Sequence, residues 1–166
     1  MRTSYLVIAG VVAALQVAQP AFAASCGGWS AKMEEDEGGS VLTASVCGGP
    51  KGDAHLLLAC FDTPVLSYDL GATGQQLEPG ISGAFDFKAD GKTVTKTLQL
   101  EAMYNYFTLQ LPKADPLLDL LRGKGDVLVS AAKYGESSFP LKGSSAAIGK
   151  VLAQCGKAAP ADGDAD

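Results

Sequence analysis

Apolar and polar residues alternate along much of the chain, which is the pattern of strands that bury one face. The clearest case is MYNYFTLQL (103–111), where Phe107 and Leu109 share one side and Tyr104 and Tyr106 share the other. We assign the side of Phe107 to the core and expect the two tyrosines on the wetter side. Further strand patterns, including the unbroken apolar run HLLLACF, cover 29–33, 40–46, 55–61, 65–70, 81–88, 92–100, 126–132 and 137–141.

Two segments have the spacing and end signals of helices. In DPLLDLLRG (115–123), Asp115 can cap the first turn and Gly123 suits a left-handed exit. The second predicted helix covers 144–155, is capped by one of the two serines at its start, and has apolar residues at i, i+3/i+4 and i+7.

The order of these elements predicts the fold class. Asp90-Gly91 lies between two strand patterns and is the residue pair that a two-residue hairpin turn prefers. Strands dominate and a helix closes the series, so we predict a mainly β fold. The expected architecture is an antiparallel β-sandwich or barrel of about eight or nine strands, with a short helix and a C-terminal helix.

The first residues have the pattern of an exported protein. Arg2 precedes an apolar stretch (5–17) that is short for a membrane span, and AFA (21–23) places small residues where signal peptidase cuts. We expect cleavage after Ala23 and a periplasmic or secreted protein. The alternative is a lipoprotein modified at Cys26. Because Ala23 stands where lipoproteins usually carry a bulky aliphatic residue, the soluble form is favoured.

The mature chain is expected to hold one β-rich binding domain (24–156) and a disordered acidic tail (157–166). The sequence has 13 Lys and Arg against 18 Asp and Glu, a net charge of −5, which becomes −6 once Arg2 is removed (12 − 18 = −6). This charge repels phosphate backbones and anionic lipid headgroups, so nucleic acid and membrane surfaces are poor partners. A basic protein is the favoured partner, and the oligomeric state stays open.

Cys26, Cys47, Cys60 and Cys155 all lie in the expected mature chain. An even number of cysteines in an exported domain indicates two disulfides, with three possible connectivities. A hairpin predicted near residues 36–37 brings Cys26 opposite Cys47, while Cys60 and Cys155 lie on apolar faces of a strand and the last helix. We therefore expect Cys26–Cys47 and Cys60–Cys155. Metal binding is the poorer alternative, because no C-x₂-C spacing occurs and His55 is the single histidine, so we expect neither metal nor cofactor.

Candidate catalytic groups are few. His55 and the nearby Asp53 could be matched with a serine on paper, but no G-x-S-x-G motif marks a nucleophile. The glycine-rich pieces GGPKGD and GATG lack the spacing of phosphate-binding loops. We expect no catalytic residue and no enzyme activity.

A binding surface has more support. Tyr104 and Tyr106 offer rigid contact area with a hydrogen-bonding tip, which suits an interface, unless a helix covers both rings. Phe61 and Tyr68 extend this patch if the strand register turns them outward. A second candidate is an acidic hairpin tip, which is either an exposed turn or a docking patch for a basic partner. It consists of Glu34, Glu35, Asp36 and Glu37.

Four motifs carry a resemblance to known proteins: LLLACFD (56–62), KADGK (88–92), DPLLDLLRG (115–123) and FPLKGSSAAIGKVLAQC (139–155). Together they resemble small exported proteins of alphaproteobacteria. Some of these are similar in role to periplasmic inhibitors of c-type lysozyme and of peptidoglycan hydrolases. The resemblance implies a small disulfide-bonded β-barrel or sandwich that blocks a hydrolase cleft with a loop.

One departure from the lysozyme-inhibitor pattern concerns its S-G-A-x-Y loop. Here Ser82-Gly83-Ala84 is followed by Phe85 and comes too soon after Cys60, so no inhibitory role is assigned to Ser82. A weaker resemblance joins the chain to type VI secretion accessory proteins and invasion-associated B-type proteins. The leading hypothesis is an inhibitor or regulator of a lysozyme-like peptidoglycan hydrolase. The alternative is an accessory or structural factor in envelope assembly, secretion or host invasion.

Overall fold

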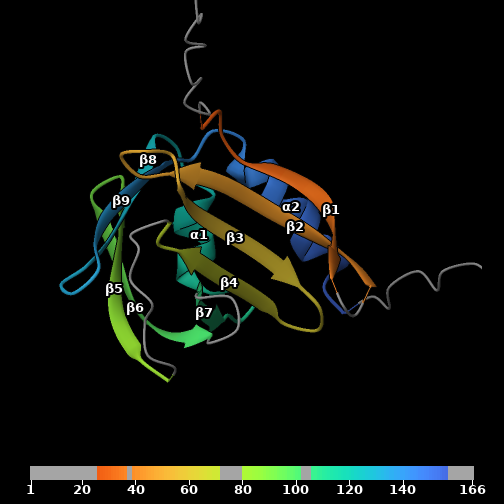
Figure 1. Cartoon of the computed structure of the whole chain (residues 1–166). Coiled ribbons are helices and arrows are strands. Elements are labelled where there is room, and N and C mark those ends of the chain that lie inside the picture. The colour runs from red at the N-terminus through yellow and green to blue at the C-terminus, as the bar shows by residue number, and fades with distance from the viewer. Residues whose placement is uncertain (1–25, 37–38, 72–79, 102–105, 157–166) are drawn as a thin grey trace, which may run out of the picture.

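The computed structural model describes residues 26–36, 39–71, 80–101 and 106–156, which form one nine-stranded antiparallel sheet and two helices (Figure 1). The strands lie in the order β1-β2-β3-β4-β7-β6-β5-β8-β9. Their bounds are β1 Ser30–Asp36, β2 Gly39–Gly48, β3 Ala54–Cys60, β4 Pro64–Asp69, β5 Ser82–Ala89, β6 Lys92–Glu101, β7 Tyr106–Gln110, β8 Asp126–Ala131 and β9 Gly135–Pro140. The helices are α1 Pro116–Leu121 and α2 Ser144–Gln154. The predicted mainly β, antiparallel fold is confirmed.

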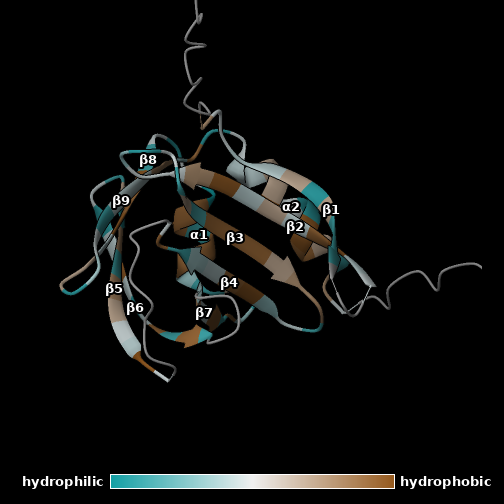
Figure 2. Cartoon of the chain, in the orientation of Figure 1, coloured by the Kyte–Doolittle hydropathy of each residue, from teal (hydrophilic) through white to brown (hydrophobic). Residues whose placement is uncertain are grey.

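One face of the sheet is buried and the other is largely open, as the alternation predicts. In β3, Leu56 and Leu58 have no exposed surface, while the alternate residues His55 and Leu57 are half-buried. The backbone register places Leu56 beside Tyr68 of β4. Hydrophobic positions accordingly mark β3 in Figure 2. Even the apolar run HLLLACF therefore follows the two-residue period of a strand with two different faces.

The sheet curls until its last strand reaches the first two. The amide of Gly49, just after β2, donates to the carbonyl of Ser138 in β9 at 3.1 Å. The amide of Trp29, just before β1, donates to the carbonyl of Lys142 at 2.8 Å. A Cβ at Gly48 would collide with the Ser138 carbonyl and the Phe139 ring, so only glycine permits this approach. The result is a barrel-like enclosure around one core.

Helix α1 packs against β5, β6 and α2, with Pro116 and Asp119 exposed to solvent (Figure 1). Its four leucines are buried. Asp115 caps it as predicted, since its side chain accepts a hydrogen bond from the Leu117 amide at 2.9 Å. The same carboxylate receives Lys96 Nζ of β6 at 2.7 Å, which ties the start of the helix to the sheet.

The predicted left-handed exit at Gly123 is wrong. Residues with positive φ include Gly125 (φ 76°) but not Gly123. The amides of Arg122 and Gly123 bond back to helix carbonyls, Gly123 to Leu120 at 3.1 Å, so the helix ends in a tightened turn. The left-handed residue comes two positions later, where the chain turns into β8.

Helix α2 covers the inner side of β1, β2 and β3. Its N-cap is Gly143 in a left-handed conformation (φ 80°), with no side-chain capping bond, so the predicted serine cap is wrong. A Cβ at Gly143 would lie 2.9 Å from the Trp29 carbonyl, so backbone packing rather than capping sets this position. Ser144 instead begins the helix and has no exposed surface.

Both predicted disulfides are present. Cys26–Cys47 joins residues 21 positions apart, and Cys60–Cys155 joins residues 95 apart and ties the end of α2 to the end of β3. The expected signal (1–23) and tail (157–166) lie outside the described residues. Within the part of the chain that the structure describes, no helix is long and apolar enough to cross a membrane.

Removing the long-range disulfide is expected to destabilise the protein more than removing the short-range one. Chain-entropy arguments give about 5 kcal/mol for the double variant Cys60→Ser/Cys155→Ser and about 3 kcal/mol for Cys26→Ser/Cys47→Ser. Urea unfolding of each variant beside the parent measures both differences. The short-range variant serves as the matched control, and an equal loss in the two variants would contradict the expected order.

Candidate functional site

Tyr106 and Tyr68, two of the residues predicted to contribute to one patch, lie on opposite faces of the sheet. Tyr106 neighbours the fully buried Phe107 and points the other way, toward the outer face, where it is half-buried. Tyr68 is 2% exposed and points into the core, so it does not extend the outer patch. Tyr104, the other member of the predicted pair, lies outside the described residues.

Phe61 is 57% exposed but lies far from Tyr106. The register aligns Tyr106 with Asp69 and Asp69 with His55. Phe61 is six residues beyond His55 along the chain (61 − 55 = 6), about 20 Å at strand spacing. The two aromatic side chains therefore do not form one contact surface.

The acidic hairpin tip lies where β2 begins, whereas Cys47 and its neighbour His55 lie where β2 ends. Glu34 and Glu35 are exposed, and Glu35 accepts a hydrogen bond from Ser40 Oγ at 2.9 Å. Asp36 pairs with Gly39 through the backbone, and Glu37 lies outside the described residues. Ser40 lies seven residues before Cys47 (47 − 40 = 7), about 23 Å along β2. The acidic tip is therefore remote from the end of β2 that carries Cys47.

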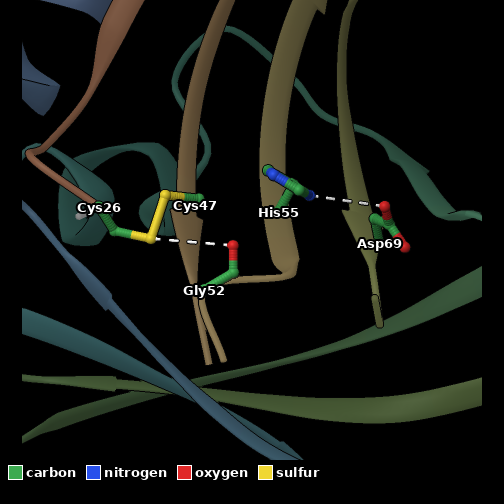
Figure 3. Close-up of a disulfide and its surroundings, with 5 residues drawn as sticks. All are labelled: Cys26, Cys47, Gly52, His55 and Asp69. Carbon is green, nitrogen blue, oxygen red and sulfur yellow. Dashed lines mark hydrogen bonds and ion pairs between the residues drawn. A yellow bond between two sulfur atoms is a disulfide. The ribbon is translucent and has the colours of Figure 1, made fainter. Parts of the chain in front are cut away.

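One row of outward residues crosses the sheet where β2, β4 and β6 end and β3 and β7 begin. The register aligns Cys47, His55, Asp69, Tyr106 and Glu101 in turn. His55 Nδ1 lies 3.6 Å from Asp69 Oδ2 (Figure 3), so the partner of His55 is Asp69. Asp69 also accepts the amide of Gly71 at 2.8 Å, which holds the chain as it leaves β4.

The Cys26–Cys47 disulfide lies at the same end and braces the turn between β2 and β3. Cys26 Sγ is 4.0 Å from the carbonyl oxygen of Gly52 in that turn (Figure 3). From the other side, a Cβ at Gly71 would lie 2.6 Å from the Asp53 carbonyl, so the two backbones are in close contact. The turn that carries Lys51 and Asp53 is therefore held from both sides.

A cavity of about 270 Å³ opens at this end of the enclosure, between the β2–β3 turn and the β8–β9 hairpin. We call it the mouth cavity. The side chains that give it chemical character are those of Lys51, Asp53, Tyr68, Tyr134, Glu136 and Ser137. Apolar wall and polar rim together are the usual composition of a small-molecule or side-chain pocket.

Tyr134 forms the aromatic wall of the mouth cavity, although it belongs to the β8–β9 turn. Its ring stacks on Phe85 (centroids 5.8 Å apart, planes 9° apart) and lies 4.8 Å from the Phe107 ring. Room for it comes from Gly83, where a Cβ would lie 3.0 Å from the Tyr134 ring. Alternation along the chain gives no signal for Tyr134, because turn residues have no period.

Tyr68 supplies a buried hydroxyl to the same cavity. Its ring meets Phe85 and Phe139 edge-on, at centroid distances of 5.6 and 5.8 Å. Burial raises the pKa of the Tyr68 phenol, a hydrogen bond with Ser137 partly offsets this, and the charge of Asp69 raises it further. The group therefore stays protonated and neutral. Burial, with the charge of Asp69 adding to it, also raises the pKa of Tyr106.

A second cavity, of about 690 Å³, lies beside the start of α2 and the turn that leads into β8. Arg122, Lys124 and Lys142 line it, and all three are exposed. Its lining is exposed or half-buried except for Leu141, so it is a surface depression. Among its lining residues, Arg122, Lys124 and Lys142 are basic and Asp126 is acidic, so this depression is basic overall.

Above about pH 10, Tyr68 is expected to lower the stability of the fold. Burial raises its pKa in the folded chain above the ordinary phenol value of 10.0, so the unfolded chain releases the proton first. The stabilisation is fully present below the unfolded pKa and is lost as the pH rises through the folded one. Urea unfolding across this range should show a fall with pH that Tyr68→Phe makes shallower. Identical slopes in parent and variant would contradict this.

Gly83→Ala is expected to push the Tyr134 ring off Phe85. The backbone of Gly83 is not left-handed, so the new methyl causes no backbone strain and meets the rings of Tyr134 (3.0 Å) and Phe85 (3.2 Å). Overpacking of this kind costs about 1–3 kcal/mol. The ring-proton shifts of Tyr134 and the free energy of unfolding measure both effects. Gly149→Ala in α2, with open space around its Cβ, is the control and should be neutral or slightly stabilising. Unchanged Tyr134 ring-proton shifts in Gly83→Ala would contradict the expected displacement of the ring.

No protein-family model matches the chain, no curated protein matches it, and no solved structure matches it. Among the described residues, no group of three or more His, Cys, Asp or Glu side chains is placed to hold a metal ion. What the arrangement offers is a braced, aromatic-walled cavity with carboxylates at its rim.

Proposed function

We propose that this chain is a non-catalytic binding protein of an oxidising compartment outside the cytoplasm, and that it binds a basic protein. The observation that carries the proposal is the gathering of carboxylates at the end with the mouth cavity. Four separate elements contribute to this set, which consists of Asp53, Asp69, Glu101 and Glu136. Lys51 and Lys133 are the lysines of the adjoining turns, so negative charge prevails at this end.

The uneven distribution of charge supports an oriented encounter. A basic partner is attracted to these carboxylates and repelled by the depression that Arg122, Lys124 and Lys142 line. Complementary charge of this kind raises association rates and selects the docking orientation more than it raises affinity. Tyr106 lies in the outer row beside Asp69 and Glu101, where an aromatic group can add contact area.

The proposed partner is a lysozyme-like peptidoglycan hydrolase, with this chain as its inhibitor or regulator. Enzymes that act on an anionic cell wall gain from a positive surface, which an acidic inhibitor can match. The resemblance of the four sequence motifs to periplasmic hydrolase inhibitors supports the same partner. Two disulfides suit the oxidising compartment where such hydrolases work.

A second candidate, an accessory factor in envelope assembly or secretion, is favoured by the edge of the sheet. Strand β1 is terminal in the strand order, so among the described strands it pairs only with β2. A free edge can accept a strand from an assembly partner. Lys32, Glu34 and Glu35 place charge along it, which restrains indiscriminate pairing.

The test is binding of the processed, disulfide-bonded chain to a c-type lysozyme and to envelope hydrolases. We expect micromolar or tighter binding that weakens with salt, together with slower hydrolysis of cell-wall substrate. Glu101→Lys/Glu136→Lys, two exposed changes at the carboxylate end, should lower the association rate constant about tenfold or more.

Asp62→Lys/Asp126→Lys is the matched control, because it makes the same change in net charge at exposed positions elsewhere. It should retain most of the binding. Equal weakening of binding by both double variants would show that the attraction depends on net charge and not on the carboxylates near the mouth cavity. No binding to any hydrolase at about 10 µM, a weak-affinity threshold of roughly 7 kcal/mol, would reject the proposed partner.

A further inference from the structure

The mouth cavity has the size of one side chain rather than of a free ligand. Its volume of about 270 Å³ is below the range of about 300–1,000 Å³ that drug-sized ligands occupy. It opens between two hairpin turns at the carboxylate end, where the partner is proposed to dock. A group projecting from a docked protein surface can therefore reach it.

The lining of the cavity changes from apolar inside to acidic at the rim. Ala54, Leu70 and the rings of Tyr68 and Tyr134 form the apolar part. The Tyr68 hydroxyl is neutral and already hydrogen-bonded to Ser137, so it adds no charge. The charged side chains of the lining are Lys51, Asp53 and Glu136, which sum to −1 (1 − 2 = −1). A side chain with a long apolar stem and a cationic head group matches this lining, because the stem can contact the apolar part and the head group can contact the carboxylates.

The geometry favours a guanidinium over an ammonium. The flat ring of Tyr134 is held in place by Phe85 and Phe107, and a planar guanidinium stacks on such a face. The two carboxylates come from different elements, Asp53 from the β2–β3 turn and Glu136 from β9. A guanidinium has five N–H donors and can serve two carboxylates at once, whereas an ammonium acts as a point charge.

The cavity is braced before any ligand arrives. The Cys26–Cys47 disulfide and Gly71 contact the turn that carries Asp53, and the Tyr68–Ser137 hydrogen bond joins β4 to β9. Pre-organisation of this kind lowers the ordering cost of binding. We infer that the mouth cavity receives one arginine side chain of the partner protein, an inference that rests on the proposed binding of a basic protein.

Substitution of Lys51 tests the sign of the ligand's charge. If the guest is cationic, Lys51→Met removes a repulsion and tightens binding, and Asp53→Asn or Glu136→Gln loosens it. If the guest is an anion, all three effects change sign. If it is a neutral sugar, charge changes have little effect, and hydroxyl contacts with Tyr68 and Ser137 matter instead.

The experiment titrates the processed, disulfide-bonded chain with N-acetyl-arginine amide and follows the amide and ring resonances of Tyr134 and Ser137 by NMR. N-acetyl-lysine amide, acetate and N-acetylglucosamine are the comparison probes. We expect saturable shifts with the arginine probe, at least about fivefold weaker binding of the lysine probe, and about tenfold weakening by Asp53→Asn or Glu136→Gln. Asp62→Asn is the control outside the cavity and should change nothing.

Preference for acetate or the sugar, or tightening by Asp53→Asn, overturns the inference. Equal binding of both amino-acid probes also overturns it, because the planar head would then be irrelevant. The same variants measured against the hydrolase separate the two proposals. A hydrolase bound equally by the parent and by Asp53→Asn/Glu136→Gln rejects the arginine pocket and leaves the proposed function intact. Arginine binding without hydrolase binding rejects the partner and keeps the pocket.

Discussion

The fold depends on closing a nine-stranded sheet upon itself so that its apolar face is removed from water. Closure takes place where β9 meets the end of β2, and it requires backbone to lie against backbone. Gly48 permits that contact, since any side chain there would collide with Ser138 and Phe139. The hydrogen bonds from Gly49 to Ser138 and from Trp29 to Lys142 then join the two margins. With the sheet closed, Phe139 joins Tyr68 and Phe85 in the centre of the core.

The closed sheet is completed by two different features. Helix α1 packs against β5, β6 and α2, where its leucines are buried and Asp115 anchors it to Lys96. The ring of Tyr134 packs on Phe85 and lines the mouth cavity. Each disulfide braces a different place: Cys60–Cys155 holds α2 against β3, while Cys26–Cys47 lies against the turn at the mouth cavity. Stability and the candidate site therefore share the same covalent framework.

Much of the secondary structure is predictable because its causes are local. Asp90-Gly91 forms the expected turn, with φ positive at both residues (49° and 70°), since this pair tolerates the conformation that a two-residue hairpin needs. Asp115 caps α1 because its carboxylate reaches the next helix amides. The Cys26–Cys47 bond follows from a hairpin, whereas Cys60–Cys155 joins residues 95 apart and was predicted from the apolar faces of a strand and a helix. The predictions of a hydrolase partner and of export stay predictions.

The sequence by itself determined the strand pattern, the positions of both helices, the cysteine pairing and the acidic character of the molecule. These depend on residue period, turn chemistry and composition, which the order and kind of the residues fix without tertiary contacts. Only the tertiary structure decided that Tyr68 faces inward, that His55 pairs with Asp69 rather than Asp53, and that Tyr134 stacks on Phe85. Strands such as β4 and β7 pair across long stretches of chain, and a shift of one residue there would reverse every side chain. Register of that kind is set by how the whole core fills, and no local pattern encodes it.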